Sequence, residues 1–152
     1  MQATIQKLNN IILDYTPKLE QIPHDILGKK TNPGKWSKLE ILGHLADSAQ
    51  NNLRRFLVAQ YEENPKIVYR QDDWVALSGY LNYPPAELIT LWCSLNKHMS
   101  MVLQNMPEAN ASRTCDTNNP EFHTIAWLAE DYVKHLLHHI HQVLDMEPVA
   151  YP

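Results

Sequence analysis

The stretch DYVKHLLHHIHQV, residues 131–143, predicts an amphipathic helix that holds four of the chain's eight histidines. At about 100° per residue, Lys134 and His141 lie opposite its apolar face. His135 and His139 lie between the two faces, four residues apart, so their rings stand above one another on successive turns. Two imidazoles at this spacing can bind one metal ion. The expected buried face consists of Ala129, Val133, Leu136, Ile140, Val143 and Leu144.

The other polar residues of this helix have different expected roles. His138 lies nearer to the solvent side, and we expect His141 not to bind metal. Asp131 precedes His135 by four residues, and we expect its carboxylate to accept a ring N–H and so fix the tautomer of a ligating imidazole. An H-x-x-x-H pair alone also occurs by chance in histidine-rich helices, so a metal site needs a third ligand.

A second helix is predicted by GKWSKLEILGHLADSAQNNLRRF, residues 34–56. Ser37 and Glu40 have capping-box spacing, which places the N-cap at Ser37, and the apolar periodicity continues to about residue 61. Trp36 is expected to pack on Ile41 as a hydrophobic staple.

A polar stripe on this second helix offers the third ligand. It lies opposite the centre of the apolar face and consists of His44, Ser48, Asn51 and Arg55. Short neutral groups beside a histidine are typical of a wet cleft between helices, although a solvent-exposed face is the alternative. Arg55 has two candidate roles, binding an anionic substrate or forming a surface ion pair.

Helical periodicity elsewhere predicts an all-α fold, a four-helix bundle forming a single domain over residues 1–152. The first helix should end before Pro17, which either breaks the helical run or, with Thr16 as cap, begins a short further turn. Trp74 and Tyr80, in an ordered crossover between the second and third helices, should anchor that segment to the core. The third helix should begin at Pro84 and Pro85, with Leu88, Leu91, Trp92, Leu95, Met99 and Val102 on one stripe. The expected ranges are 2–15 for the first helix, 62–85 for the crossover with a helical turn at 74–80, 107–122 for an aperiodic loop and 124–144 for the fourth helix.

The amino-acid composition limits the kinds of molecule that the protein is expected to bind. The net charge of -4 provides no basic field for nucleic acid or an anionic membrane, so we expect a small-molecule substrate. No stretch approaches the roughly 18 to 20 apolar residues of a membrane span. The two cysteines, Cys93 and Cys115, are far apart and form no CxxC pair, which favours reduced thiols in the cytoplasm.

Taken together, residues 34–56 and 131–143 resemble the DinB-like superfamily, also known for its YfiT-like metal-dependent hydrolases. The resemblance covers essentially the whole chain in helix order. It implies a four-helix bundle in which one histidine of the second long helix and an H-x-x-x-H pair of the last helix bind a divalent metal. Carried over by position, these ligands are His44, His135 and His139, the same three residues that the helical wheels select.

The resemblance also implies an activity. Members include transferases that use a low-molecular-weight thiol, such as bacillithiol, mycothiol or glutathione, and a thiol-dependent isomerase. We therefore expect attack of a metal-bound thiolate on a small electrophile, with zinc, nickel or iron as the ion. The alternatives are hydrolysis by metal-bound water and a non-enzymatic bundle that binds metal or a small ligand. Relatives often dimerise, and Trp127 on the expected outer side of the last helix is compatible with a homodimer.

Other catalytic classes lack their motifs. A di-iron bundle needs Glu-x-x-His pairs, but Glu40 precedes His44 by four residues and Glu130 precedes His135 by five. The H-E-x-x-H motif of zincins and the G-x-S-x-G elbow of hydrolases are both absent. The sequence thus predicts no catalytic nucleophile of the protein itself. His24 and His123 are expected to face water, and His98 to lie at a core boundary.

Overall fold

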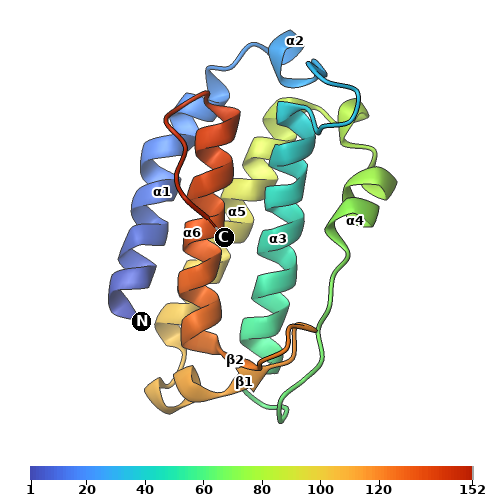
Figure 1. The fold of residues 1–152 in the computed structure, drawn as a ribbon. Coiled ribbons are helices and arrows are strands. Elements are labelled where there is room, and N and C mark those ends of the chain that lie inside the picture. The colour runs from blue at the N-terminus through green and yellow to red at the C-terminus, as the bar shows by residue number, and fades with distance from the viewer. Residues whose placement is uncertain (152) are drawn as a thin grey trace.

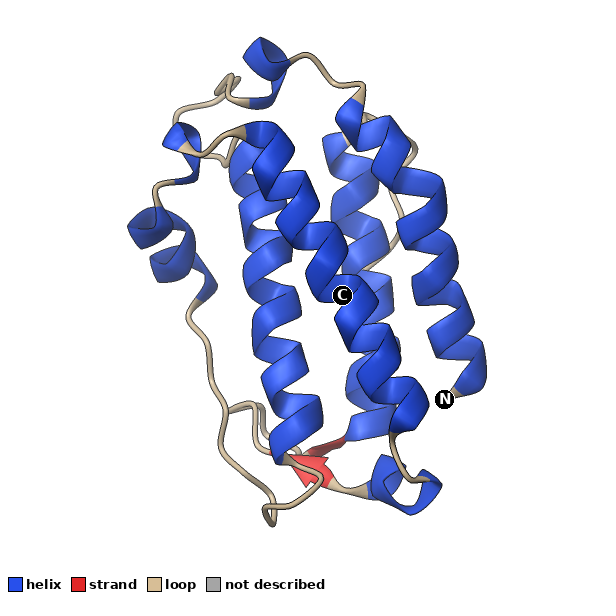
Figure 2. Cartoon of the chain, turned by 180° about the vertical axis from the view of Figure 1, so that it is seen from behind, coloured by secondary structure: helices blue, strands red, loops and turns tan. Residues whose placement is uncertain are grey.

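Four long helices pack side by side in the computed structural model, which describes residues 1–151 (Figure 1). They are α1 (Gln2–Glu20), α3 (Lys38–Val58), α5 (Pro85–Asn105) and α6 (Ile125–Val143). Shorter elements join them: α2 (His24–Leu27), α4 (Gln71–Ser78), η1 (Tyr80–Asn82), η2 (Glu108–Ser112), β1 (Thr114–Cys115) and β2 (His123–Thr124). Seen from behind, the two short strands lie at one end of the bundle (Figure 2). The predicted all-α four-helix bundle is confirmed.

The start of α3 is the predicted one. The Ser37 hydroxyl accepts from the Glu40 N–H at 3.2 Å, and the Ser37 N–H donates to the Glu40 carboxylate at 2.7 Å, which completes the capping box. The helix ends at Val58, before the expected residue 61. Trp36 is half-buried, and its ring centroid lies 5.0 Å from that of His44, so this aromatic packs against the polar stripe.

The first helix is longer than predicted. We expected it to end before Pro17, but α1 continues through this proline to Glu20. Proline lacks an N–H and therefore removes one helical hydrogen bond. The Thr16 hydroxyl donates to the Ile12 carbonyl at 2.7 Å, and Leu19, one turn further on, is fully buried. Burial of that last turn outweighs the missing bond.

The buried face of α5 differs from the predicted stripe. Leu91 is 39% exposed, while Ile89, Cys93 and Asn96 are buried together with Leu88 and Trp92. The face is wide because α5 packs against both α1 and α3. Buried Asn96 is satisfied, since it accepts from the Tyr132 hydroxyl at 2.6 Å and donates to the Trp92 carbonyl at 2.8 Å.

The crossover is ordered, as predicted, and contains the eight-residue helix α4. Gly79 then adopts the left-handed conformation, with φ 65°, and begins η1. The Tyr80 ring lies so close to Gly43 that a Cβ atom there would overlap it. The Tyr80 hydroxyl donates to the Asp47 carboxylate at 2.5 Å. Tyr80 therefore anchors the crossover to α3, as expected for this aromatic residue.

The loop after α5 is more regular than predicted. Residues 107–122 were expected to be aperiodic, yet they include η2 and β1, and β1 pairs antiparallel with β2. A two-residue strand is too short to produce an alternating pattern, so the sequence carries no sign of it. Cys115 in β1 is buried, and its thiol donates to the Pro65 carbonyl at 3.2 Å.

The chain after α6 folds back along that helix (Figure 1). His138 Nδ1 lies 2.6 Å from the Val149 carbonyl, and the Tyr151 hydroxyl donates to Asp131 at 3.0 Å. These contacts place Tyr151 near His135, with ring centroids 5.3 Å apart. Within residues 1–151, no helix is long and apolar enough to span a membrane.

Candidate metal centre

The three predicted histidines converge between α3 and α6. One ring nitrogen from each of His44, His135 and His139 lies within 4.8 Å of the others. The Nε2 atoms of His44 and His135 are 3.0 Å apart. Ring centroids are separated by 5.0 Å between His44 and either partner, and by 4.6 Å between His135 and His139. We refer to these three residues as the histidine cluster.

Two side chains orient the rings of the cluster. The Tyr69 hydroxyl lies 2.9 Å from His44 Nδ1, and the Gln142 carboxamide oxygen accepts from His139 Nδ1 at 3.0 Å. Because that oxygen can only accept, His139 carries its proton on Nδ1 and keeps a lone pair on Nε2. Partners of this kind fix the tautomer of a metal-ligating histidine.

The predicted role of Asp131 is wrong. Its carboxylate accepts from the Tyr151 hydroxyl, and it makes no hydrogen bond to His135. His135 Nδ1 is buried and has no hydrogen-bond partner among the described residues. Asp131 has the right spacing to reach His135, but its hydrogen-bond donor comes from the returning chain beyond α6.

Sequence reasoning missed both orienting side chains. Gln142 follows His139 by three residues on one helix, a spacing from which the contact could have been predicted. Tyr69 lies in the crossover, 25 residues after His44, and no local pattern connects the two.

Burial keeps the cluster neutral. Burial, assisted by repulsion from His139, lowers the pKa of His44 to about 3. Burial and the neighbouring histidines lower the pKa of His135 to about 2, and burial also lowers the pKa of His139. Neutral imidazole is the form that binds metal.

The donor set fits a divalent ion. Facing Nε2 atoms of neutral imidazoles can satisfy one another only if one of them carries a proton, whereas a cation can accept lone pairs from all three rings. Three nitrogen ligands suit zinc, nickel or iron and leave an open coordination position. The unpartnered His135 Nδ1 is consistent with this reading, because metal binding through Nε2 requires the ring proton on Nδ1.

A polar cavity of about 250 Å³ borders the cluster at His44 and His135. Three residues of the predicted polar stripe line it, namely His44, Ser48 and Arg55, which confirms the predicted cleft for most of the stripe. Asn51 is the exception, because it is buried and donates to the Asp47 carbonyl. The exposed-stripe alternative is wrong: His44 is only 1% exposed. Its lining residues include His44, Ser48, Asn52, Arg55, Thr117 and Asp131.

A second opening, of about 740 Å³, borders the cluster at His139. Gln142 and Trp36 line it, together with the lysines of the segment before α3, and we call it the lysine groove. Gln71 lines both the lysine groove and the polar cavity. The basic lining residues of the groove are Lys29, Lys35 and Lys38, and the acidic ones are Asp72 and Asp145.

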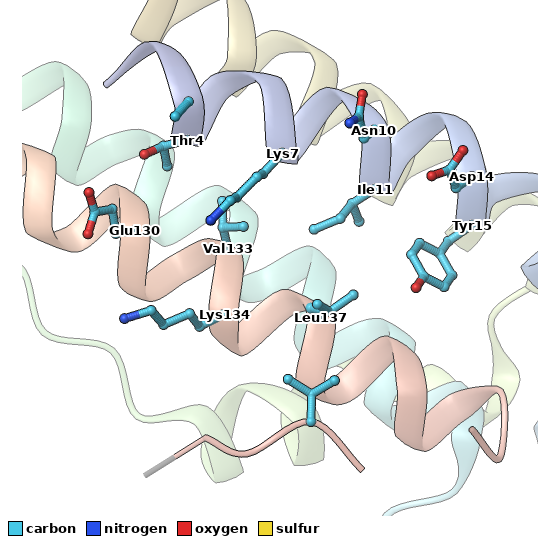
Figure 3. A pocket seen from close by; sticks show the side chains of 12 residues that line it. Thr4, Lys7, Asn10, Ile11, Asp14, Tyr15, Glu130, Val133, Lys134 and Leu137 are labelled. Carbon is cyan, nitrogen blue, oxygen red and sulfur yellow. The ribbon is translucent and has the colours of Figure 1, made fainter. Parts of the chain in front are cut away.

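A third cavity lies away from the cluster, between α1 and α6 (Figure 3). It measures about 540 Å³, and Ile11, Val133 and Leu137 supply its apolar surface. Its charged lining residues, labelled in Figure 3, are Lys7, Asp14, Glu130 and Lys134. None of the three clustered histidines lines it, so we place the functional site elsewhere.

The remaining histidines lie outside the cluster. His138 and His141 bind the returning chain through the carbonyls of Val149 and Glu147, and neither belongs to the histidine cluster. His123 is half-buried and stacks on Trp127 with centroids 3.6 Å apart, so the expectation that it faces water is wrong. Trp127 also lines the polar cavity and is 44% exposed. His24 and His98 are exposed, so His98 is not at the core boundary.

The family model and the relatives in sequence point to the same family. The model of the DinB superfamily matches residues 14–143. A protein of Oceanobacillus iheyensis that carries the name "Putative metal-dependent hydrolase" is 26% identical over 149 residues, covering 84% of this chain and 85% of its own. YfiT of Bacillus subtilis, with the same designation, is 24% identical over 144 residues, covering 93% of this chain and 81% of its own.

Solved structures share the fold. YfiT of Bacillus subtilis superposes with a TM-score of 0.85 at 24% identity, covering 95% of this chain and 83% of its own. A mycothiol-dependent maleylpyruvate isomerase superposes with a TM-score of 0.73 at 14% identity, covering 98% of this chain but only 61% of its own. At these identities the likeness concerns the architecture alone.

Proposed function

The chain belongs to the DinB superfamily, and from this premise we propose that it is a metal-dependent transferase that joins a low-molecular-weight thiol to a small electrophile. The observation that carries the proposal is the histidine cluster, in which one nitrogen from each of three neutral rings lies within 4.8 Å of the others, close enough to bind one ion together. His44, His135 and His139 would hold the ion. Tyr69 and Gln142 would keep the rings of His44 and His139 turned towards it.

The ion would supply charge for activating a nucleophile. At three neutral imidazoles, a divalent metal keeps an open position and lowers the pKa of a thiol or water that reaches it. In the proposed reaction, the thiol sulfur forms a bond to the electrophilic carbon while the leaving group departs with its bonding electrons. The thiol proton passes to solvent. The protein contributes binding and orientation, and no side chain becomes covalently attached.

Two separate openings at the cluster support a reaction of two organic substrates. Hydrolysis needs room for one organic molecule and water, whereas a transferase must admit a thiol and an electrophile together. The lysine groove suits an anionic thiol, since Lys29 and Lys35 have no carboxylate within 4.0 Å in the described part of the chain. The mycothiol dependence named for one structural neighbour agrees with this choice.

The test begins with protein purified without a histidine tag and analysed for bound metal. Zinc, nickel or iron is then supplied, and consumption of bacillithiol, mycothiol or glutathione is followed in the presence of a chromogenic aryl halide. We expect thioether to form only when metal, thiol and electrophile are all present. His135→Ala should abolish this turnover, whereas His138→Ala, altered at a neighbouring ring outside the cluster, should retain it.

The hydrolase alternative has specific support, because the relatives in sequence are named as metal-dependent hydrolases. It predicts metal-dependent cleavage of an activated ester at a rate that does not change when thiol is omitted. That result would replace the transferase proposal. Metal binding without turnover in either assay would favour the non-enzymatic bundle.

A further inference from the structure

Arg55 places an unpaired cation at the polar cavity. Its guanidinium donates through Nε to the Ile67 carbonyl at 3.1 Å and through Nη1 to the Asn52 side chain at 3.2 Å. A guanidinium has five N–H donors, so these bonds use only part of its capacity. Among residues 1–151, no carboxylate lies within 4.0 Å of it.

A half-buried cation without an ion-pair partner costs free energy in the protein without ligand. Arg55 is half-buried, and burial lowers its pKa, which means that the surroundings disfavour its charged form. A guanidinium nevertheless stays protonated because its ordinary pKa is so high. Asp131, the carboxylate in the same cavity, favours the charged form of Arg55 through space, but it makes no ion pair with Arg55 and accepts from the Tyr151 hydroxyl. A bound anion would compensate the charge of Arg55.

The position of Arg55 on α3 relates it to the metal ligand. Arg55 follows His44 by eleven residues, which corresponds to three turns with an offset of about 20° and a rise of about 16 Å. Ser48 and Asn52 lie between them on the same cavity wall. One wall of the cavity therefore carries a ligand of the candidate metal site at one end and a guanidinium at the other.

An unused hydroxyl is the second feature of this subsite. Thr117 lines the same cavity, and its hydroxyl oxygen is buried without a hydrogen-bond partner in the described chain. A buried hydroxyl left unpaired costs free energy, and a carboxylate can accept several hydrogen bonds at once. Arg55 and Thr117 thus provide a cationic donor and a neutral one to the same ligand space.

We propose that Arg55, assisted by Thr117, binds a carboxylate group of the electrophilic substrate, whose reactive carbon extends towards the histidine cluster. The substrate is then a small, slender carboxylic acid, because the cavity lies below the roughly 300–1,000 Å³ of sites for drug-sized ligands. The assignment of the reactive end rests on the proposed transferase function. The carboxylate subsite itself does not.

A matched pair of electrophiles tests this inference. Para-(chloromethyl)benzoate and its neutral carboxamide share the same reactive carbon and differ in the charge at the far end. With metal-loaded protein and a thiol, we expect the carboxylate to have a KM lower by about tenfold or more, since charge-assisted hydrogen bonds are stronger than neutral ones. Equal KM values for the two compounds in the wild type would overturn the proposal without any variant.

Arg55→Gln should remove the preference for the carboxylate mainly through KM, and Arg55→Lys should retain part of it. The matched control is Arg113→Gln. Arg113 also crosslinks backbone carbonyls, donating to Ala59 at 2.5 Å and to Glu62 at 2.8 Å, but it does not line the polar cavity. If Arg113→Gln loses the preference as Arg55→Gln does, the effect is structural and the subsite assignment fails.

Binding of para-methylbenzoate, which has no leaving group, separates this inference from the transferase proposal. Calorimetry should show binding to wild-type and Arg113→Gln protein, and binding weaker by about tenfold or more in Arg55→Gln. Arg55-dependent binding without turnover of either electrophile would uphold the subsite and refute the transferase. Turnover with no Arg55-dependent binding would uphold the transferase and refute the carboxylate subsite.

Discussion

Each clustered histidine uses its two ring nitrogens differently. In His139, Nδ1 donates to Gln142, which leaves Nε2 for the ion. His138 is adjacent in sequence but points about 100° away, and its ring holds the Val149 carbonyl. Metal binding is therefore a property of particular residues and not of histidine density.

The metal-dependent stability of the protein should depend on three residues. An ion at about 100 times its dissociation constant adds about 2.7 kcal/mol to the free energy of unfolding, because it binds the folded cluster and not the unfolded chain. Alanine at His44, His135 or His139 should remove most of this gain in thermal unfolding. His138→Ala and His141→Ala should keep it. Loss in His138→Ala with retention in His139→Ala would show that the ligand assignment on α6 is wrong.

Tyr69→Phe should weaken metal binding by about 10- to 100-fold, because the phenol that orients His44 through Nδ1 is removed while the ring remains. Titration with a competing chelator measures the affinity. Tyr83→Phe is the control, since Tyr83 packs against the core without contacting the cluster. An unchanged affinity in Tyr69→Phe would mean that His44 is oriented by packing alone.

At the scale of elements, α3 determines the position of most of the site. Its capping box sets where the helix begins, and its register brings His44 to α6 and Arg55 to the far end of the polar cavity. The crossover then covers this face and brings Tyr69 to His44. Two contacts, one at the start of α3 and one at Gly43, can be tested by substitution.

Ser37→Ala should lower the free energy of unfolding by about 1 kcal/mol, because the Glu40 N–H loses its acceptor in a buried position. Urea unfolding measures the change. Ser94→Ala, at an exposed position within α5, should be neutral or slightly stabilising, because alanine has the higher helix propensity. An unchanged midpoint in Ser37→Ala would show that the capping box does not stabilise the helix.

Gly43→Ala should destabilise the protein although alanine favours helices by about 1 kcal/mol. The added Cβ would overlap the Tyr80 ring, and relieving the overlap should cost about 1–3 kcal/mol and disturb the hydrogen bond to Asp47. Gly28→Ala provides the comparison, since a Cβ there meets no atom within 4 Å. A more stable Gly43→Ala protein would indicate that the crossover shifts without cost.

At the scale of the whole molecule, burial of titratable groups makes stability depend on pH. The folded-state pKa values of His44 and His135, about 3 and about 2, lie below the ordinary value of 6.5. The unfolded chain therefore binds more protons, and their contribution to stability is present above pH 6.5 and declines as the pH falls. Asp47 has the opposite effect on the pH dependence. Burial, partly offset by the Tyr80 hydrogen bond, raises its pKa from 3.8 to about 6, so its contribution to stability grows as the pH falls.

Metal-free protein should consequently lose stability from about pH 6.5 downward, by at least roughly 1.4 kcal/mol per pH unit, because Asp47 offsets one of the two histidines while the lowered pKa of His139 adds to the decline. Urea midpoints at about pH 7.5 and about pH 5 test this. Asp47→Asn should steepen the decline, since it removes the opposing group. Equal midpoints at both pH values would show that the histidines are protonated in the folded state.

The sequence alone determined the four long helices and the three clustered histidines. Apolar periodicity defines the faces of α3 and α6, and the turn of the helix then places His44 on the polar stripe of α3 and His135 and His139 at the border of the apolar face of α6. Capping at Ser37 is equally local, since it depends on residues three apart. Such features are predictable because they arise from the geometry of a single helix.

Tertiary packing decided the rest. Whether α1 ends at Pro17 depends on burial of Leu19, and the partner of Asp131 depends on where the returning chain places Tyr151. Tyr69 reaches His44 from the crossover, which Tyr80 anchors against Gly43. These outcomes depend on contacts between residues far apart in sequence, whose free energies no local pattern encodes, so the ligands were predictable and the groups that orient them were not.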